Sequence, residues 1–154
     1  MNNTQQPHRL LRFLPFLKSF TISVIIISTV TMLQFYWYMG ALSDNMSSSC
    51  MSCSFLEDNV FMSVCTGIFL SCIFPLFSFI KRTYAKVFVE FLLLILIWIL
   101  WNHSIFVDRE ASWSTYDFKS EMYATLYLSF VPVIILGSGC VLLLHLREIK
   151  NFRL

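Results

Sequence analysis

Four long stretches of the chain are almost entirely apolar, and polar segments separate them. The apolar stretches cover residues 19–39, 59–80, 84–101 and 122–146. A helix that crosses a membrane needs about 20 apolar residues, because the hydrocarbon layer offers no water to satisfy exposed backbone groups. The pattern therefore predicts four transmembrane helices.

The polar segments between these stretches are short. They comprise residues 40–58, 81–83 and 102–121, and the two flanking segments are residues 1–18 and 147–154. Such short connections force successive helices to run antiparallel. We therefore expect an all-α membrane protein, with four antiparallel transmembrane helices in a bundle and a short first extracellular loop.

The basic residues are distributed unevenly over the polar segments. Nine of the eleven lie in, or within a few residues of, segments that the alternation of spans places on one side: Arg9, Arg12, Lys18, Lys81, Arg82, Lys86, Arg147, Lys150 and Arg153. The positive-inside rule assigns that side to the cytoplasm. Both termini are then cytoplasmic, and segments 40–58 and 102–121 face outside.

The composition agrees with a membrane protein. Of the 154 residues 57% are hydrophobic and only 13% are charged, about half the charged share of a soluble domain. The mean hydropathy is +0.70. The net charge of +2 is too small to indicate a nucleic-acid-binding protein. The first apolar run is too long for a cleaved signal sequence, so we expect it to be retained as a span.

The pair Cys50 and Cys53, in the sequence Cys50-Met51-Ser52-Cys53, lies in the first outer segment. A structural disulfide is one interpretation, because that segment faces an oxidising compartment. A redox-active pair, a metal site or two unpaired thiols are the alternatives, although two cysteines alone make a poor zinc site. Cys65, Cys72 and Cys140 lie in predicted spans, where packing is the expected role.

Glu90 is the only acidic residue inside a predicted span, and an intramembrane acid is a candidate functional residue. Lys86 lies four residues earlier, so a local ion pair is the simpler explanation. His8, His103 and His145 lie at opposite ends of the predicted bundle and form no single site. We expect His145 at the membrane interface, and Gln34 and the Ser and Thr residues of the first span in interhelical hydrogen bonds.

Two further features concern packing and modification. Gly137 and Gly139 offer a surface where a neighbouring helix can approach the fourth span closely. Asn45 begins the sequence Asn45-Met46-Ser47, an N-glycosylation signal in the first outer segment, and is the expected acceptor in a eukaryotic host. The sequence indicates no metal and no cofactor.

Several of these segments resemble the superfamily of peripheral myelin protein, epithelial membrane proteins, claudins and calcium-channel gamma subunits. The likeness lies in Tyr123-Ala124-Thr125-Leu126-Tyr127, Pro132, Gly137-Ser138-Gly139 and Leu146-Arg147-Glu148 of the fourth span, with Trp37, Lys81-Arg82 and the pair Cys50 and Cys53. The resemblance implies a multi-pass protein of the plasma membrane or the secretory pathway that acts through contacts with neighbouring proteins.

These observations predict a non-enzymatic tetraspan protein that binds other integral membrane proteins, or a second copy of itself, and modulates their assembly, trafficking or adhesion. Two alternatives stay open. One is a membrane thiol-disulfide oxidoreductase that uses Cys50 and Cys53. The other is a bacterial inner-membrane immunity protein that protects its host from a pore-forming toxin.

Overall fold

The computed structural model describes the backbone of residues 7–151 and the side chains of residues 16–146. It consists of four long helices, α1 (Pro7–Met39), α2 (Phe55–Ile73), α3 (Thr83–Arg109) and α4 (Phe118–Asn151), and three short 3-10 turns, η1 (Gly40–Leu42), η2 (Phe74–Phe79) and η3 (Ala111–Trp113). Four segments of the described chain are long and apolar enough to cross a membrane: Phe16–Leu42, Phe55–Phe79, Thr83–Trp113 and Phe118–Leu146. The prediction of four apolar helices is confirmed. Predictions that rest on the side chains of residues 1–15 and 147–154, His8 among them, lie outside the described residues.

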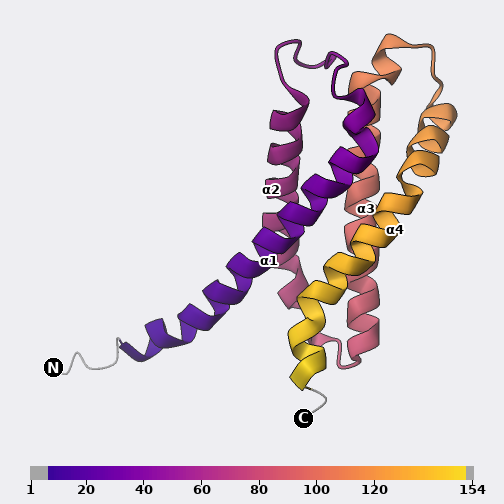
Figure 1. Cartoon of the computed structure of the whole chain (residues 1–154). Coiled ribbons are helices and arrows are strands. Elements are labelled where there is room, and N and C mark those ends of the chain that lie inside the picture. The colour runs from indigo at the N-terminus through magenta and orange to yellow at the C-terminus, as the bar shows by residue number, and fades with distance from the viewer. Residues whose placement is uncertain (1–6, 152–154) are drawn as a thin grey trace.

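The helices alternate in direction along the bundle (Figure 1). The connections α1–α2 and α3–α4 lie at one end, which we call the loop end, and the connection α2–α3 lies at the opposite end, the link end. Helix α1 packs along α2 and crosses α4, and α3 packs along α4. Helices α2 and α3 contact each other at few positions. The bundle is therefore two hairpins joined mainly through α1 and α4.

The helices do not end where the apolar runs end. Helix α2 begins at Phe55, before the predicted residue 59, because Ser54 and Glu57 form a capping box in which each side chain accepts the other's backbone N–H, at 3.2 and 3.1 Å. Near the other end of that predicted span the chain changes to the 3-10 turn η2. Pro75 lies there and has no backbone N–H for an α-helical hydrogen bond.

Residues 102–121, which we predicted as the second outer loop, are helical over much of their length. Helix α3 continues to Arg109, and α4 already begins at Phe118. Hydropathy marks where the hydrocarbon layer ends, whereas backbone hydrogen bonds continue the helix beyond it. In the first turn of α4, Ser120 donates its backbone N–H to Oδ1 of Asp117, the residue before the helix, at 3.3 Å. The hydrogen bonds from the Ser120 side chain and backbone hold the pKa of Asp117 below its usual value.

The distribution of polar and apolar side chains differs from that in a soluble protein, because the outer surface is apolar and the interior contains many polar side chains beside its apolar core. Large apolar side chains such as Ile25, Leu100 and Ile135 are more than half exposed on the outer surface. Inside, Gln34 and Asn102 are fully buried, and Gln34 Nε2 donates to Asn102 Oδ1 at 3.3 Å. An apolar exterior around a hydrogen-bonded interior is the arrangement that a lipid bilayer favours.

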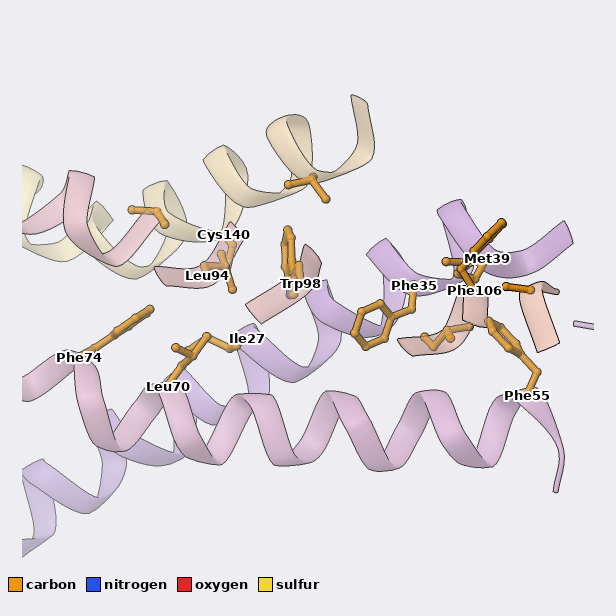
Figure 2. Close-up of a cluster of buried hydrophobic side chains, with 14 residues drawn as sticks. Ile27, Phe35, Met39, Phe55, Leu70, Phe74, Leu94, Trp98, Phe106 and Cys140 are labelled. Carbon is orange, nitrogen blue, oxygen red and sulfur yellow. The ribbon is translucent and has the colours of Figure 1, made fainter. Parts of the chain in front are cut away.

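The apolar core runs along the bundle axis and includes Ile27, Leu70, Leu94 and Trp98 (Figure 2). Trp98 is fully buried, and its Nε1 donates to Thr31 Oγ1 at 3.0 Å. The expectation that first-span polar residues bond between helices therefore holds for Gln34 and Thr31. Thr21 instead donates to Leu17 O of its own helix at 2.9 Å.

Candidate functional site

A cavity of about 260 Å³ lies toward the link end, and side chains from all four helices line it. Its polar lining combines three hydroxyls and three ionisable groups. They are Ser19 and Ser23 of α1, Ser71 of α2, Lys86 and Glu90 of α3, and His145 of α4. An ionisable cluster inside the membrane-spanning part of a protein is a candidate functional site, because charge is costly there.

Glu90 and His145 form the centre of this cluster. His145 Nε2 lies 2.5 Å from Glu90 Oε2, and the two side chains are 6% and 2% exposed. The contact joins α3 to α4 across 55 residues of sequence. His145, which we expected at the membrane interface, points into the bundle against Glu90. Glu90 is, as expected, an intramembrane acid, and its described partner is an imidazole on another helix.

Ser71 adds a hydrogen-bonding group to the same cavity. Its side chain is 2% exposed, and its Oγ has no hydrogen-bond partner among the described residues. A buried hydroxyl without a partner costs free energy. The cavity can therefore offer a carboxyl–imidazole pair, the Lys86 side chain and an unsatisfied hydroxyl to a small polar group. Within the described residues, no three His, Cys, Asp or Glu side chains gather in a way that could hold a metal ion.

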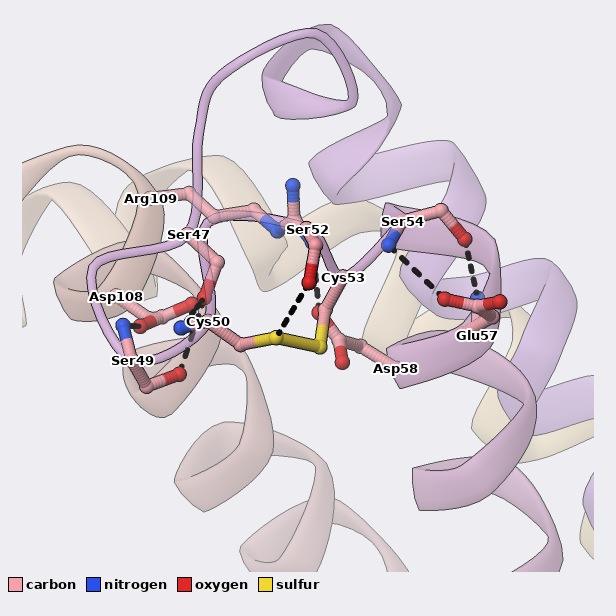
Figure 3. Close-up of a disulfide and its surroundings, with 10 residues drawn as sticks. All are labelled: Ser47, Ser49, Cys50, Ser52, Cys53, Ser54, Glu57, Asp58, Asp108 and Arg109. Atoms are coloured by element: carbon pink, nitrogen blue, oxygen red, sulfur yellow. Dashed lines mark hydrogen bonds and ion pairs between the residues drawn. A yellow bond between two sulfur atoms is a disulfide. The ribbon is translucent and has the colours of Figure 1, made fainter.

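The loop end carries a second cluster, built around the disulfide between Cys50 and Cys53 (Figure 3). Their Cα atoms are 5.4 Å apart. The preceding loop is fastened to the end of α3, because Asp108 Oδ1 accepts from both Ser48 Oγ and Ser49 N at 2.9 Å. The two cysteines thus belong to a loop that is held against the end of α3 by hydrogen bonds.

Arg109 holds the loop end together. Its side chain is 3% exposed, and its Nη2 lies 2.6 Å from Asp58 Oδ2 at the start of α2. Its Nη1 donates to Asn45 O at 2.8 Å, and its guanidinium lies 5.3 Å from the Phe55 ring centroid. Sequence reasoning missed this residue. The only available signal was a single arginine among acidic residues after a long apolar run.

Asn45, the predicted glycosylation acceptor, takes part in the same cluster. Its Nδ2 donates to Glu110 Oε2 at 3.0 Å and to Arg109 O at 3.3 Å. Ser47, the third residue of the signal, is 2% exposed. A glycan on Asn45 would replace one of the hydrogens that these contacts use.

The glycines differ in what surrounds them. A Cβ on Gly137 would lie 3.1 Å from Phe91 and 3.5 Å from Trp98, so α4 approaches α3 closely at this residue. A Cβ on Gly139 would meet no atom of the described residues within 4 Å, so there is room for a side chain at this position. The closest approach is at Gly67, which the sequence analysis did not single out. There a Cβ would lie 2.1 Å from Ser28 Oγ and 3.0 Å from Val24 O.

An open apolar groove of about 770 Å³ lies between α2 and α3, where the two helices barely touch. Cys65 and Cys72 line it from α2, and Leu100 and Trp101 line it from α3. At its base, Trp101 Nε1 donates to Thr66 Oγ1 at 3.0 Å. Cys140 is buried in the core, 1% exposed, as expected for a packing residue.

Comparison of the chain with protein-family models, with curated proteins and with solved structures finds no match.

Proposed function

We propose that this chain is a non-enzymatic multi-pass membrane protein that binds another integral membrane protein, with the groove between α2 and α3 receiving a transmembrane helix of that partner. A single observation carries the proposal. Four helices are present, yet the two in the middle of the sequence leave an apolar groove of about 770 Å³ open to the lipid.

The residues in the groove favour a helix as its occupant. Cys65, Thr66, Cys72 and Ser104 have small side chains and line it together with larger apolar ones. Small and hydroxyl-bearing residues are typical of contacts between transmembrane helices, because they let two backbones approach closely. The Thr66 hydroxyl is already satisfied by Met62 O and Trp101 Nε1, so an apolar helix can cover this hydroxyl without leaving it unpaired.

The orientation is part of the proposal. Lys81 and Arg82 are exposed at the link end, and Lys86 lies within the first turn of α3. The positive-inside rule favours the link end on the cytoplasmic side, which makes both termini cytoplasmic. The disulfide at the loop end agrees with an extracellular or luminal compartment. The resemblance to the claudin and myelin group supports a plasma-membrane or secretory-pathway location.

Site-specific photocrosslinking in native membranes tests the proposal. A photoreactive residue replaces Leu100, which lines the groove and is 61% exposed. The matched control replaces Leu128 of α4, which is 54% exposed and lies outside the groove lining. We expect a discrete product with one membrane protein, or with a second copy of the chain, from position 100 and none from position 128. Equal labelling from both positions, or lipid adducts alone, would contradict the proposal.

Photocrosslinking tests one of the two alternatives, and thiol trapping tests the other. A toxin helix as the crosslinked partner favours the immunity protein. A thiol-disulfide oxidoreductase requires Cys50 and Cys53 to exchange with a substrate thiol, so Cys50→Ser should then abolish every mixed disulfide trapped by an alkylating reagent. The oxidoreductase interpretation draws on the disulfide being half-buried beside the exposed Met51.

A further inference from the structure

A polar pocket of about 460 Å³ lies at the loop end, between α2 and α3. Asp58 and Met62 line it from α2, and residues between His103 and Arg109 line it from the last turns of α3. Ser104 lines both this pocket and the apolar groove between the same two helices. The pocket is therefore the continuation of the groove toward the loop end.

The groove and the pocket lie along the same helix faces. On α3, Leu100 lines the groove, Ser104 lines both cavities and Asp108 lines the pocket. Residues four apart lie one above the other on a helix, about 6 Å apart along its axis. On α2, Met62 of the pocket lies one turn from Thr66 of the groove. A helix seated in the groove would therefore bring one of its ends into the pocket.

Asp108 places a negative charge in this pocket that no described basic residue neutralises. Its Oδ1 accepts hydrogen bonds from Ser48 Oγ and Ser49 N, each at 2.9 Å, and both donors are neutral. Figure 3 shows the Asp108 carboxylate beside Ser49. The ion pairs among the described residues do not include Asp108, and its side chain is half-buried.

The other charged groups around the pocket do not change this sign. Arg109 is 3% exposed, and its Nη2 lies 2.6 Å from Asp58 Oδ2, so these two charges compensate each other. His103 Nε2 lies 3.6 Å from Glu121 Oε2. Glu121 would compensate a protonated His103, and a neutral His103 adds no charge. The negative charge of Asp108 remains in either state.

A guanidinium or ammonium group complements a half-buried carboxylate, and such charge complementarity selects the right partner at an interface. We propose that the transmembrane helix in the groove between α2 and α3 carries an arginine or lysine at the end nearest the loop end, and that this basic side chain pairs with Asp108. The inference rests on the proposed function and adds the chemistry by which the partner is recognised. The methylenes of a long basic side chain can cover Met62 while its charge reaches Asp108.

Photocrosslinking from position 100, combined with substitutions at position 108, tests this pairing. The chain is expressed at a low level, so that the yield of the crosslinked product follows the occupancy of the groove. Asp108→Asn removes the charge but keeps an oxygen that can accept from Ser48 and Ser49. We expect it to lower the yield about tenfold, the loss of one charge-assisted contact. Asp108→Glu keeps the charge and should retain most of the product.

Asp44→Asn is the matched control, because it removes the same charge from an exposed residue of the loop end that lies outside the pocket lining. The pairing is overturned, and the proposed function stands, if Asp108→Asn gives as much product as the wild-type chain or if both variants lose product equally. The sequence of the captured helix is a second measurement, and it decides if Asp108→Asn does not fold. An arginine or lysine should lie about two turns from the crosslinked residue toward the loop end, and a captured helix without one overturns the pairing.

Two further outcomes concern the occupant itself. The absence of a discrete product from position 100 contradicts the proposed function, and the pairing fails with it. A captured second copy of the chain supports the pairing only through Lys119, the exposed one of the two basic residues at the loop end. Lys119→Ala should then lower the yield as Asp108→Asn does, and an unchanged yield overturns the pairing.

Discussion

A single added methyl group at Gly67 should lower the stability of the chain. Replacing it with alanine adds one methyl group where α1 and α2 approach most closely. The new Cβ would lie 2.1 Å from Ser28 Oγ, 3.0 Å from Val24 O and 3.3 Å from Ser28 Cβ. Ser28 can rotate its hydroxyl away, but Val24 O belongs to the backbone of α1 and moves only if the helix moves.

The size of the effect follows from two opposing terms. Overpacking of this kind costs about 1–3 kcal/mol. Alanine in the interior of a helix regains about 0.5–1 kcal/mol relative to glycine. We therefore expect Gly67→Ala to lower the free energy of unfolding by about 1–2 kcal/mol. Adding Ser28→Ala should recover part of the loss, because it removes the shortest contact and leaves the one to Val24 O.

Equilibrium unfolding in detergent micelles by sodium dodecyl sulfate, followed by helical circular dichroism, measures these differences. Gly139→Ala is the control, since its Cβ would meet no atom within 4 Å, and we expect it to be as stable as the wild-type chain or up to about 1 kcal/mol more stable. The reasoning is refuted if Gly67→Ala is as stable as Gly139→Ala, or if Ser28→Ala restores nothing.

Three further predictions use the same assay. Arg109→Ala should cost about 2–3 kcal/mol, less than a fully buried pair because Asp58 is 30% exposed; an unchanged midpoint would show that this ion pair does not hold the loop end. Trp98→Phe should cost about 1 kcal/mol through the lost hydrogen bond to Thr31, and a loss above about 3 kcal/mol would indicate repacking instead. The double variant Cys50→Ser and Cys53→Ser should cost at most about 2 kcal/mol, since the bridge closes a very short ring. A larger loss in this double variant would mean that the disulfide, more than the contacts to Asp108, fixes the loop.

Much of the fold could be predicted from the apolar runs, while the helix ends could not. Hydropathy indicates which residues lie in the hydrocarbon layer, and residues 84–101 are the third such run. The helix itself continues to Arg109, because backbone hydrogen bonds do not depend on side-chain polarity. The capping box at Ser54 and Glu57 could have been read from the sequence, since its spacing is local.

Sequence reasoning identified only some of the residues of the two candidate sites. Glu90 was marked as an intramembrane acid because charge inside a span is rare, and the pair Cys50 and Cys53 because their spacing is short. His145 was placed at the interface, and Gly67 and Arg109 were not singled out. Each of these three acts through residues more than 35 positions away in the chain, on another helix or in another loop.

The sequence by itself determined that the chain has four apolar helices, because the cost of burying backbone groups in lipid depends only on the length and composition of each run. Which helices pack together was decided by the tertiary structure. The close approach at Gly67 fixes α1 on α2, and the Glu90–His145 contact fixes α3 on α4. The groove between α2 and α3 and the cavity at the link end depend on how the helices pack, since each is lined by residues from different helices.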